Sequence, residues 1–185
     1  MGDKRMDDIV ARMRRTSKLG RIGESLAAEA LQENGFQNVR NLNDDLSNHP
    51  FADLLAEKDG RRYFVGVKTR NEDRDIGNLN ESYNCVLVRD QVNRLLKSRG
   101  MSSDAITILA IQRVYELAND YEAVPAWIAV PTRPKDSTYC AFFGLLSELG
   151  NRRSIPMSYA ARKTYLCLVN WRYDARLIPD LTNQL

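Results

Sequence analysis

The sequence predicts an α/β fold in which a mixed β-sheet is flanked by helices and extended by strands from the C-terminal third. Three patterns indicate this fold: a helical spacing of apolar residues that ends at Gly35, a hairpin pattern after it, and several short apolar runs later in the chain. The chain has 185 residues, of which 43% are hydrophobic and 28% charged. This composition is typical of a folded protein, and this length is enough for one domain with a sizeable core.

Within that single domain, 1–185, we expect three parts. Half of residues 1–16 are charged, and this part would form a basic N-terminal arm or helix. Residues 17–115 would form the central α/β core, and residues 116–185 an extension of the sheet. In the first part, apolar residues between Asp7 and Arg15 favour a short amphipathic helix. A frayed terminus is the alternative.

The central part begins with the clearest helix of the chain. Between Ser17 and Asn34, apolar residues recur at steps of three and four, and Gly35 is placed to end the helix. Residues 36–42 then predict a short strand, and residues 43–50 a polar turn.

Two further runs, 51–58 and 61–70, predict an antiparallel hairpin. They are joined by Asp59 and Gly60, a dipeptide that tolerates the positive φ angles of a tight turn. Downstream we expect a strand end that leads into a helix closing at Gly100, so that a helix over 90–99 covers the second face of the sheet.

The remaining runs predict strands. Residues 104–114 form an apolar, β-branched run that predicts an interior strand. Three further strands are expected at 126–130, 138–146 and 163–171, extending or flanking the same sheet.

Several classes of function find no support in the composition. The three cysteines lie far apart, which indicates neither a zinc knuckle nor a disulfide framework. The single histidine, His49, is expected in a loop, and no nucleotide-binding glycine motif or GxSxG nucleophile motif occurs. A charged N-terminus and the lack of a long apolar run predict a soluble, cytoplasmic protein with no membrane contact. The net charge of +3 permits an anionic partner.

A glycine interrupts the second strand of the hairpin, which reads YFVGVKTRN from Tyr63 to Asn71. Period-two alternation places Gly66 and Lys68 on one face of this strand and brings Asp53, on the partner strand, near both. A carboxylate and a lysine that converge on half-buried strands are unusual as core residues. A simple structural ion pair is the alternative to a catalytic pair.

Two stretches, GRIGESLAAEALQENGFQNVR and PFADLLAEKDGRRYFVGVKTRN, resemble the PD-(D/E)xK nuclease superfamily, in particular its archaeal Holliday-junction resolvase and Mrr-like branch. The resemblance covers residues 1–110 and implies a restriction-endonuclease-like fold. Glu24 matches the helical glutamate of the family, Asp53 its motif aspartate and Lys68 its motif lysine. Gly66 falls where the family has its second acid, and Pro50 lies three residues before Asp53 rather than next to it.

The resemblance implies that Asp53, Glu24 and the backbone carbonyl of Val67 hold Mg²⁺ or Mn²⁺, while Lys68 orients the attacking water. With Gly66 in place of an acid, we expect weakened metal binding, with Glu24 as the main rescuing ligand. Glu57 and Glu72 are further candidates for that rescue. A purely structural role for Glu24, near the positive end of the helix dipole, is the alternative.

The implied function is a metal-dependent DNA endonuclease with a variant site. The alternative is a catalytically silent nuclease-fold protein that binds nucleic acid or another protein. Duplex or branched DNA would be held by a set of arginines near the site: Arg21, Arg61, Arg62 and Arg70. The resemblance also suggests a homodimer. A late basic group is expected to be solvated surface: Arg152, Arg153, Arg162 and Lys163.

Overall fold

The computed structural model describes residues 3–44, 51–72, 82–86 and 90–178, and it describes only the backbone of residues 3–16, 90 and 91. The predictions for His49 and Pro50 therefore lie outside the described residues. The same holds for the side chains of the expected basic arm.

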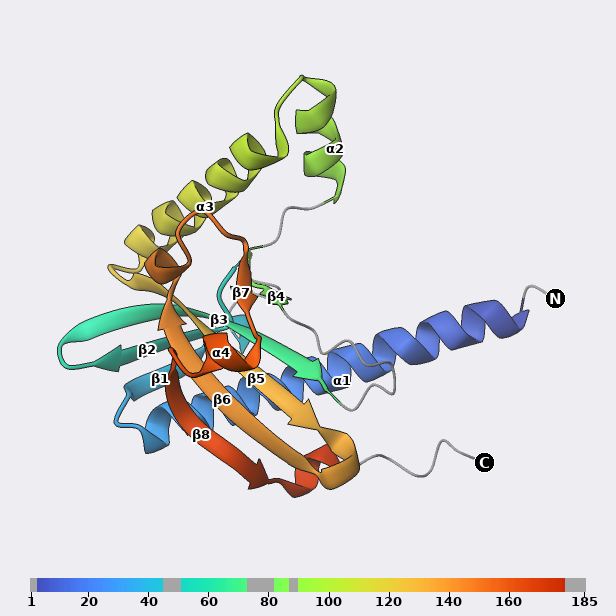
Figure 1. Cartoon of the computed structure of the whole chain (residues 1–185), viewed down its shortest axis with the longest axis vertical. Coiled ribbons are helices and arrows are strands. Elements are labelled where there is room, and N and C mark those ends of the chain that lie inside the picture. The colour runs from blue at the N-terminus through green and yellow to red at the C-terminus, as the bar shows by residue number, and fades with distance from the viewer. Residues whose placement is uncertain (1–2, 45–50, 73–81, 87–89, 179–185) are drawn as a thin grey trace.

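A mixed α/β architecture is observed, as the sequence predicts (Figure 1). One sheet has the strand order β1-β2-β3-β5-β6-β8, so strands from the C-terminal third extend it as expected. β3 and β5 are parallel, and the other neighbouring pairs are antiparallel. The strands of this sheet are β1 (Gln37–Asn41), β2 (Leu54–Lys58), β3 (Arg61–Asn71), β5 (Val124–Arg133), β6 (Thr138–Leu145) and β8 (Leu166–Tyr173). The helices are α1 (Asp3–Glu33), α2 (Asp90–Ser98), α3 (Ser103–Asp120) and α4 (Tyr159–Arg162).

α1 is one continuous helix of 31 residues, so the expected helix over 17–34 and the expected short helix near the N-terminus are parts of one element. Its N-terminal part extends beyond the sheet (Figure 1). The helix ends as predicted: Gly35 has φ 82°, and the N–H of Phe36 donates to the carbonyl of Leu31 at 3.0 Å. This is the Schellman arrangement, in which a left-handed residue turns the chain out of the helix.

The hairpin of β2 and β3 forms around the predicted turn. Asp59 and Gly60 both have positive φ angles, 52° and 73°, as a type I′ turn requires. The register pairs Leu54, the first residue of β2, with Val65, and the N–H of the preceding residue, Asp53, also donates to the carbonyl of Val65.

Alternating residues of β3 contribute to two separate cores. Val65 and Val67 pack toward α1 with Leu26 and Leu31. Phe64 belongs to the second core, on the opposite face. The second core includes, from α3 and β5, Ile111, Val114, Ala118, Trp127 and Ala129. Gly66 and Lys68 share the face of Phe64 by the same alternation.

The strand expected over 104–114 is wrong, because these residues lie in α3. Ser102 caps this helix by accepting a hydrogen bond from the Ala105 N–H at 3.1 Å. The buried residues of α3 are Ile106, Ile111, Val114 and Ala118, a spacing that follows the helical period and not the period of a strand. Tertiary packing of this face outweighs the strand preference of its isoleucines.

Two neighbouring predictions also need correction. α3, not the 90–99 helix, packs on β5, and α2 contacts α3. The strand expected near Cys85 lies just upstream, as β4 (Ser82–Asn84), and it pairs with β7 (Ser154–Pro156) in a separate two-stranded sheet. None of the described helices is long and apolar enough to cross a membrane.

Candidate functional site

Close contact between α1 and β3 sets the position of Glu24. A Cβ atom built on Gly23 would lie 1.6 Å from Oγ1 of Thr69, so only glycine lets the helix approach the strand this closely. Thr69 is buried by this contact. Glu24, the next residue of the helix, is half-buried near the start of β2.

Asp53 extends the hydrogen bonding between β2 and β3 by one further bond, which its side chain makes. Its N–H still donates to the carbonyl of Val65 at 2.9 Å, as a strand residue would. Its carboxylate oxygen Oδ2 then accepts the next N–H of β3, that of Val67, at 2.6 Å. The N–H and C=O of one strand residue point to the same edge, so the Val67 carbonyl also faces the side on which Asp53 lies.

Two asparagines, one at the end of β1 and one in the turn after it, connect Glu24 to Asp53. Asn41 donates to Oε2 of Glu24 at 3.3 Å, and Asn43 donates to Oδ1 of Asp53 at 3.5 Å. The side chain of Asn43 also hydrogen-bonds Glu24. Neither asparagine was predicted as a site residue, because the sequence of this segment indicates only the end of a strand and a polar turn. The one signal is the residue type, because an asparagine such as Asn41 favours a turn in which its side chain accepts the N–H two residues on.

The electrostatics of the site centre on Glu24. Burial and the negative charge of Asp53 raise the pKa of Glu24, against the hydrogen bonds from Asn41 and Asn43 and the positive charge of Lys68. Lys68 is therefore close enough to act on Glu24 electrostatically. It also acts on Cys85, whose pKa burial raises to about 11. The structure thus brings Glu24, Asp53 and Lys68 into one half-buried group.

Gly66 lies against Phe51. A Cβ at Gly66 would come within 3.1 Å of the Phe51 carbonyl oxygen and 3.5 Å of its ring. An acid at this position would therefore require a small shift of the Phe51 backbone.

The donor atoms of this group suit a hard cation. They are carboxylate, amide and backbone oxygens, which Mg²⁺ and Mn²⁺ accept as ligands. Across the described parts of the chain, no three His, Cys, Asp or Glu side chains gather closely enough to hold a metal ion. A cation here would thus depend on two carboxylates and on neutral oxygens.

Glu57 and Glu72 are both engaged elsewhere. Glu57 accepts from Asn38 at 2.7 Å and from Arg62 at 2.9 Å, near the hairpin turn. The side chain of Glu72 is only 2% exposed, and it forms an ion pair with Arg162. Tyr83 donates to the same carboxylate at 2.9 Å.

Arg162 therefore does not belong to a solvated basic surface, which corrects that expectation. It is the buried partner of Glu72, and its Nε also donates to the carbonyl of Met157 at 2.8 Å. The pairing could not be predicted from the sequence, because its two members lie 90 residues apart.

The predicted DNA-binding arginines lie in different places. Arg21 is exposed on α1, one turn before Glu24. Arg70 lies on the face of Lys68, and its Nη1 donates to the Thr69 carbonyl at 2.8 Å. Arg61 and Arg62 lie at the hairpin turn, about 20–23 Å along β3 from Lys68 at about 3.3 Å per residue.

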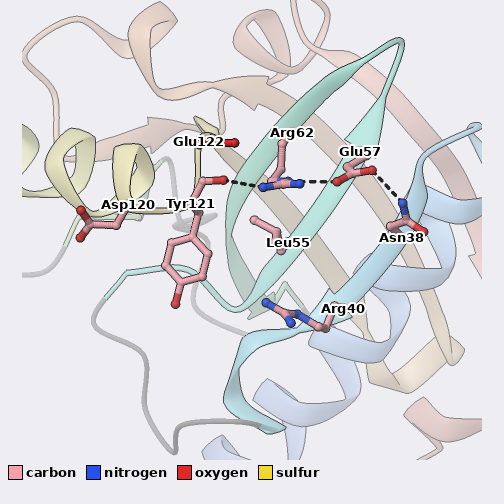
Figure 2. A pocket seen from close by; sticks show the side chains of 8 residues that line it. All are labelled: Asn38, Arg40, Leu55, Glu57, Arg62, Asp120, Tyr121 and Glu122. Carbon is pink, nitrogen blue, oxygen red and sulfur yellow. Dashed lines mark hydrogen bonds and ion pairs between the residues drawn. The ribbon is translucent and has the colours of Figure 1, made fainter.

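A groove opens beside Arg62 (Figure 2). Arg62 reaches from Glu57 to the carbonyl of Tyr121, to which it donates at 3.0 Å. The lining residues are Asn38, Arg40, Leu55, Glu57, Arg62, Asp120, Tyr121 and Glu122. Their charges are mixed, and the groove is distinct from the group around Glu24.

Comparisons with known proteins add one distant likeness. No family model and no curated protein matches the chain. One solved structure that matches is Hjc of Archaeoglobus fulgidus, a Holliday junction resolvase from an archaeal hyperthermophile. It is 15% identical with a TM-score of 0.44, and the match covers 80% of this chain and 96% of that chain. These values are too low to transfer a residue role or an activity.

Proposed function

We propose that this chain is a metal-dependent DNA endonuclease with a variant PD-(D/E)xK site. The observation that supports the proposal is the group of Glu24, Asp53 and Lys68 at the start of β2. Two carboxylates, one from a helix and one at the start of a strand, with a lysine beside them, suit the hydrolysis of a phosphodiester, because the carboxylates can share a cation and the lysine can offset charge on the phosphate.

Each residue has a role in this proposal. Mg²⁺ or Mn²⁺, held by Asp53, Glu24 and the Val67 carbonyl, would supply an activated water and neutralise charge on the phosphate. The Val67 N–H fixes the orientation of the Asp53 carboxylate. Lys68 orients the attacking water and offsets the developing negative charge.

Gly66 lowers the cation affinity of this site. One missing anion at 4 Å corresponds to about 4 kcal/mol at an effective dielectric of about 20, and water that fills the gap reduces the loss. The remaining carboxylates still form a workable set, because Mg²⁺ is commonly held by one or two carboxylates together with waters.

Cleavage of plasmid and branched DNA in the presence of Mg²⁺ or Mn²⁺ tests the proposal. We expect Asp53→Asn and Lys68→Met to abolish cleavage. Asp104→Asn and Lys97→Met are matched controls, because both residues are exposed on helices away from the site. The absence of cleavage by the wild type, or equal cleavage by all variants, would reject an endonuclease.

A catalytically silent nucleic-acid-binding protein is the second candidate, and Gly66 together with the Phe51 carbonyl beside it favours this function. It predicts that the protein binds duplex DNA in EDTA with a steep dependence on salt and never cuts it. In either case, of the four arginines expected to contact phosphates, Arg21 and Arg70 lie nearest to the group of Glu24, Asp53 and Lys68. The homodimer and the single-domain organisation stay predictions, which light scattering and limited proteolysis can test.

A further inference from the structure

Asn43 lies between the two carboxylates of the candidate site. Its amide nitrogen is 3.5 Å from Oδ1 of Asp53, and the same side chain hydrogen-bonds Glu24. A group that touches both carboxylates occupies the region in which a cation shared by them would also lie. This position is defined by contacts from α1, from the turn after β1 and from the start of β2.

The backbone of Asn43 is held independently of its amide group. Its N–H donates to Oδ1 of Asn41 at 2.8 Å, which closes a local turn of the kind that asparagine favours. The next anchor is the N–H of Leu42, which donates to the Asp53 carbonyl at 2.9 Å. Rotation of the Asn43 amide about its terminal torsion therefore leaves the turn in place.

An amide suits this position because its two ends have opposite character. The NH₂ end donates to carboxylates when no cation is present, which offsets the repulsion between Glu24 and Asp53. The oxygen end is an accepted ligand of hard cations. Half a turn about the terminal torsion exchanges the two ends, and this torsion has broad, roughly two-fold minima.

We propose that Asn43 supplies an oxygen ligand in place of the acid that is missing at Gly66, turning its amide from donor to acceptor when a divalent cation binds. This inference rests on the proposed function. The Asn43 amide adds a ligand without adding a charge, so no further negative charge is placed beside Glu24 and Asp53 in the cation-free protein. The Phe51 carbonyl can then stay where it is, against the space that a side chain at position 66 would need.

Calorimetric titration of the full chain with Mn²⁺ and with Mg²⁺ tests this role. We expect Asn43→Ala to bind about tenfold more weakly than the wild type, at the low end of losses seen when metal-site partners are removed. Asn38→Ala is the matched control, because Asn38 is exposed in β1 and its amide donates to Glu57. Asn43→Ser replaces Asn43→Ala if the alanine variant does not fold, since serine can keep local turn contacts but is too short to span both carboxylates.

A crystal structure with bound Mg²⁺ separates a ligand from a residue that only positions the carboxylates. We expect Oδ1 of Asn43 at about 2.0–2.1 Å from the ion, the usual distance for Mg²⁺. An amide that still donates to the carboxylates, or an affinity unchanged in Asn43→Ala, would overturn the inference and leave the proposed function standing. If the wild type binds neither cation, both fail together. Asp53→Asn, which removes a ligand of the proposed function itself, shows which of these cases applies.

Discussion

The carboxylate of Asp53 accepts the backbone N–H of Val67 in a hydrogen bond of 2.6 Å. Asp53 thereby replaces one step of the β2–β3 ladder with its side chain, and its other oxygen faces the amide of Asn43. A single residue thus closes the hairpin and contributes a negative charge to the candidate site, so its two roles need variants that separate them.

Asp53→Ala removes both the hydrogen bond and the charge. We expect it to lower the free energy of unfolding by about 1–3 kcal/mol, because the N–H of the buried residue Val67 loses its acceptor. Asp53→Asn keeps an acceptor oxygen and is expected to lose less stability while still losing cation binding. Urea denaturation without metal measures both variants. Equal losses of stability would show that the charge, and not the hydrogen bond, is what stabilises the hairpin.

The glycine at position 23 allows α1 to contact β3. We expect Gly23→Ala to lower the free energy of unfolding by about 1–3 kcal/mol or more, because its methyl group would overlap the side chain of Thr69. Gly20→Ala is the control on the same helix, because a Cβ atom added to Gly20 would have no atom within 4 Å. It should stabilise the protein by up to about 1 kcal/mol through helix propensity. Thermal unfolding measures the Tm of the two variants. A shift of both Tm values in the same direction would contradict this packing.

Glu24 predicts a pH dependence of stability. Its pKa is raised above the ordinary value of 4.5 in the folded protein by burial and by Asp53. The folded state therefore holds the proton more tightly than the unfolded state, and ionisation of Glu24 lowers the free energy of unfolding as the pH rises above 4.5. We expect Glu24→Gln to be more stable than the wild type near neutral pH without metal.

The stability difference between Glu24→Gln and the wild type should vanish below pH 4.5, where Glu24 is protonated in both states. Denaturation curves of both proteins from acid to neutral pH give this comparison, since all other carboxylates are the same in the two proteins. Added Mg²⁺ should stabilise the wild type and not Glu24→Gln. A glutamine variant that is less stable at neutral pH would show that the ionised carboxylate stabilises the fold.

Local chemistry explains which features the sequence could predict. The end of α1 at Gly35 and the turn at Asp59 and Gly60 follow from positive φ angles, which few residue types adopt. The pairing of β2 with β3 then follows from the turn, and it places Asp53 beside Val65 and Val67. These features depend on neighbours in the sequence, so a single chain contains enough information to predict them.

Features that depend on distant partners could not be predicted in the same way. The sequence of α3 predicts a strand because its isoleucines and valine favour strands, whereas its buried face follows the packing on β5. Asn43 became part of the site because the chain folds β1 back against α1. Arg162 forms an ion pair with Glu72, which directly follows β3. No local pattern marks such pairs.

The buried ion pair of Glu72 and Arg162 predicts a large loss of stability on removal of one partner. We expect Arg162→Met to lower the free energy of unfolding by about 3–5 kcal/mol, because it leaves the Glu72 carboxylate buried without its countercharge. The control is Arg113→Met, whose partner Glu116 is 62% exposed, and there we expect a loss of at most about 1 kcal/mol from that ion pair. Guanidinium denaturation compares the two. Similar small losses would mean that solvent reaches Glu72.

Gly66→Glu restores the acid that the resemblance would place on β3, and Gly66→Gln is its matched control without charge. Both variants must shift the Phe51 backbone, which we expect to cost about 1–3 kcal/mol. Without metal, Gly66→Glu should be the less stable of the two, because it adds a third carboxylate beside Glu24 and Asp53. With Mn²⁺ or Mg²⁺ the order should reverse, since the added carboxylate can bind the ion, and the stabilisation of the folded state grows with the logarithm of the cation concentration above Kd. Thermal unfolding at increasing cation concentration measures this reversal. A cation-dependent stabilisation no larger than that of the wild type would place position 66 outside the cation site, and the missing acid would then have no bearing on activity.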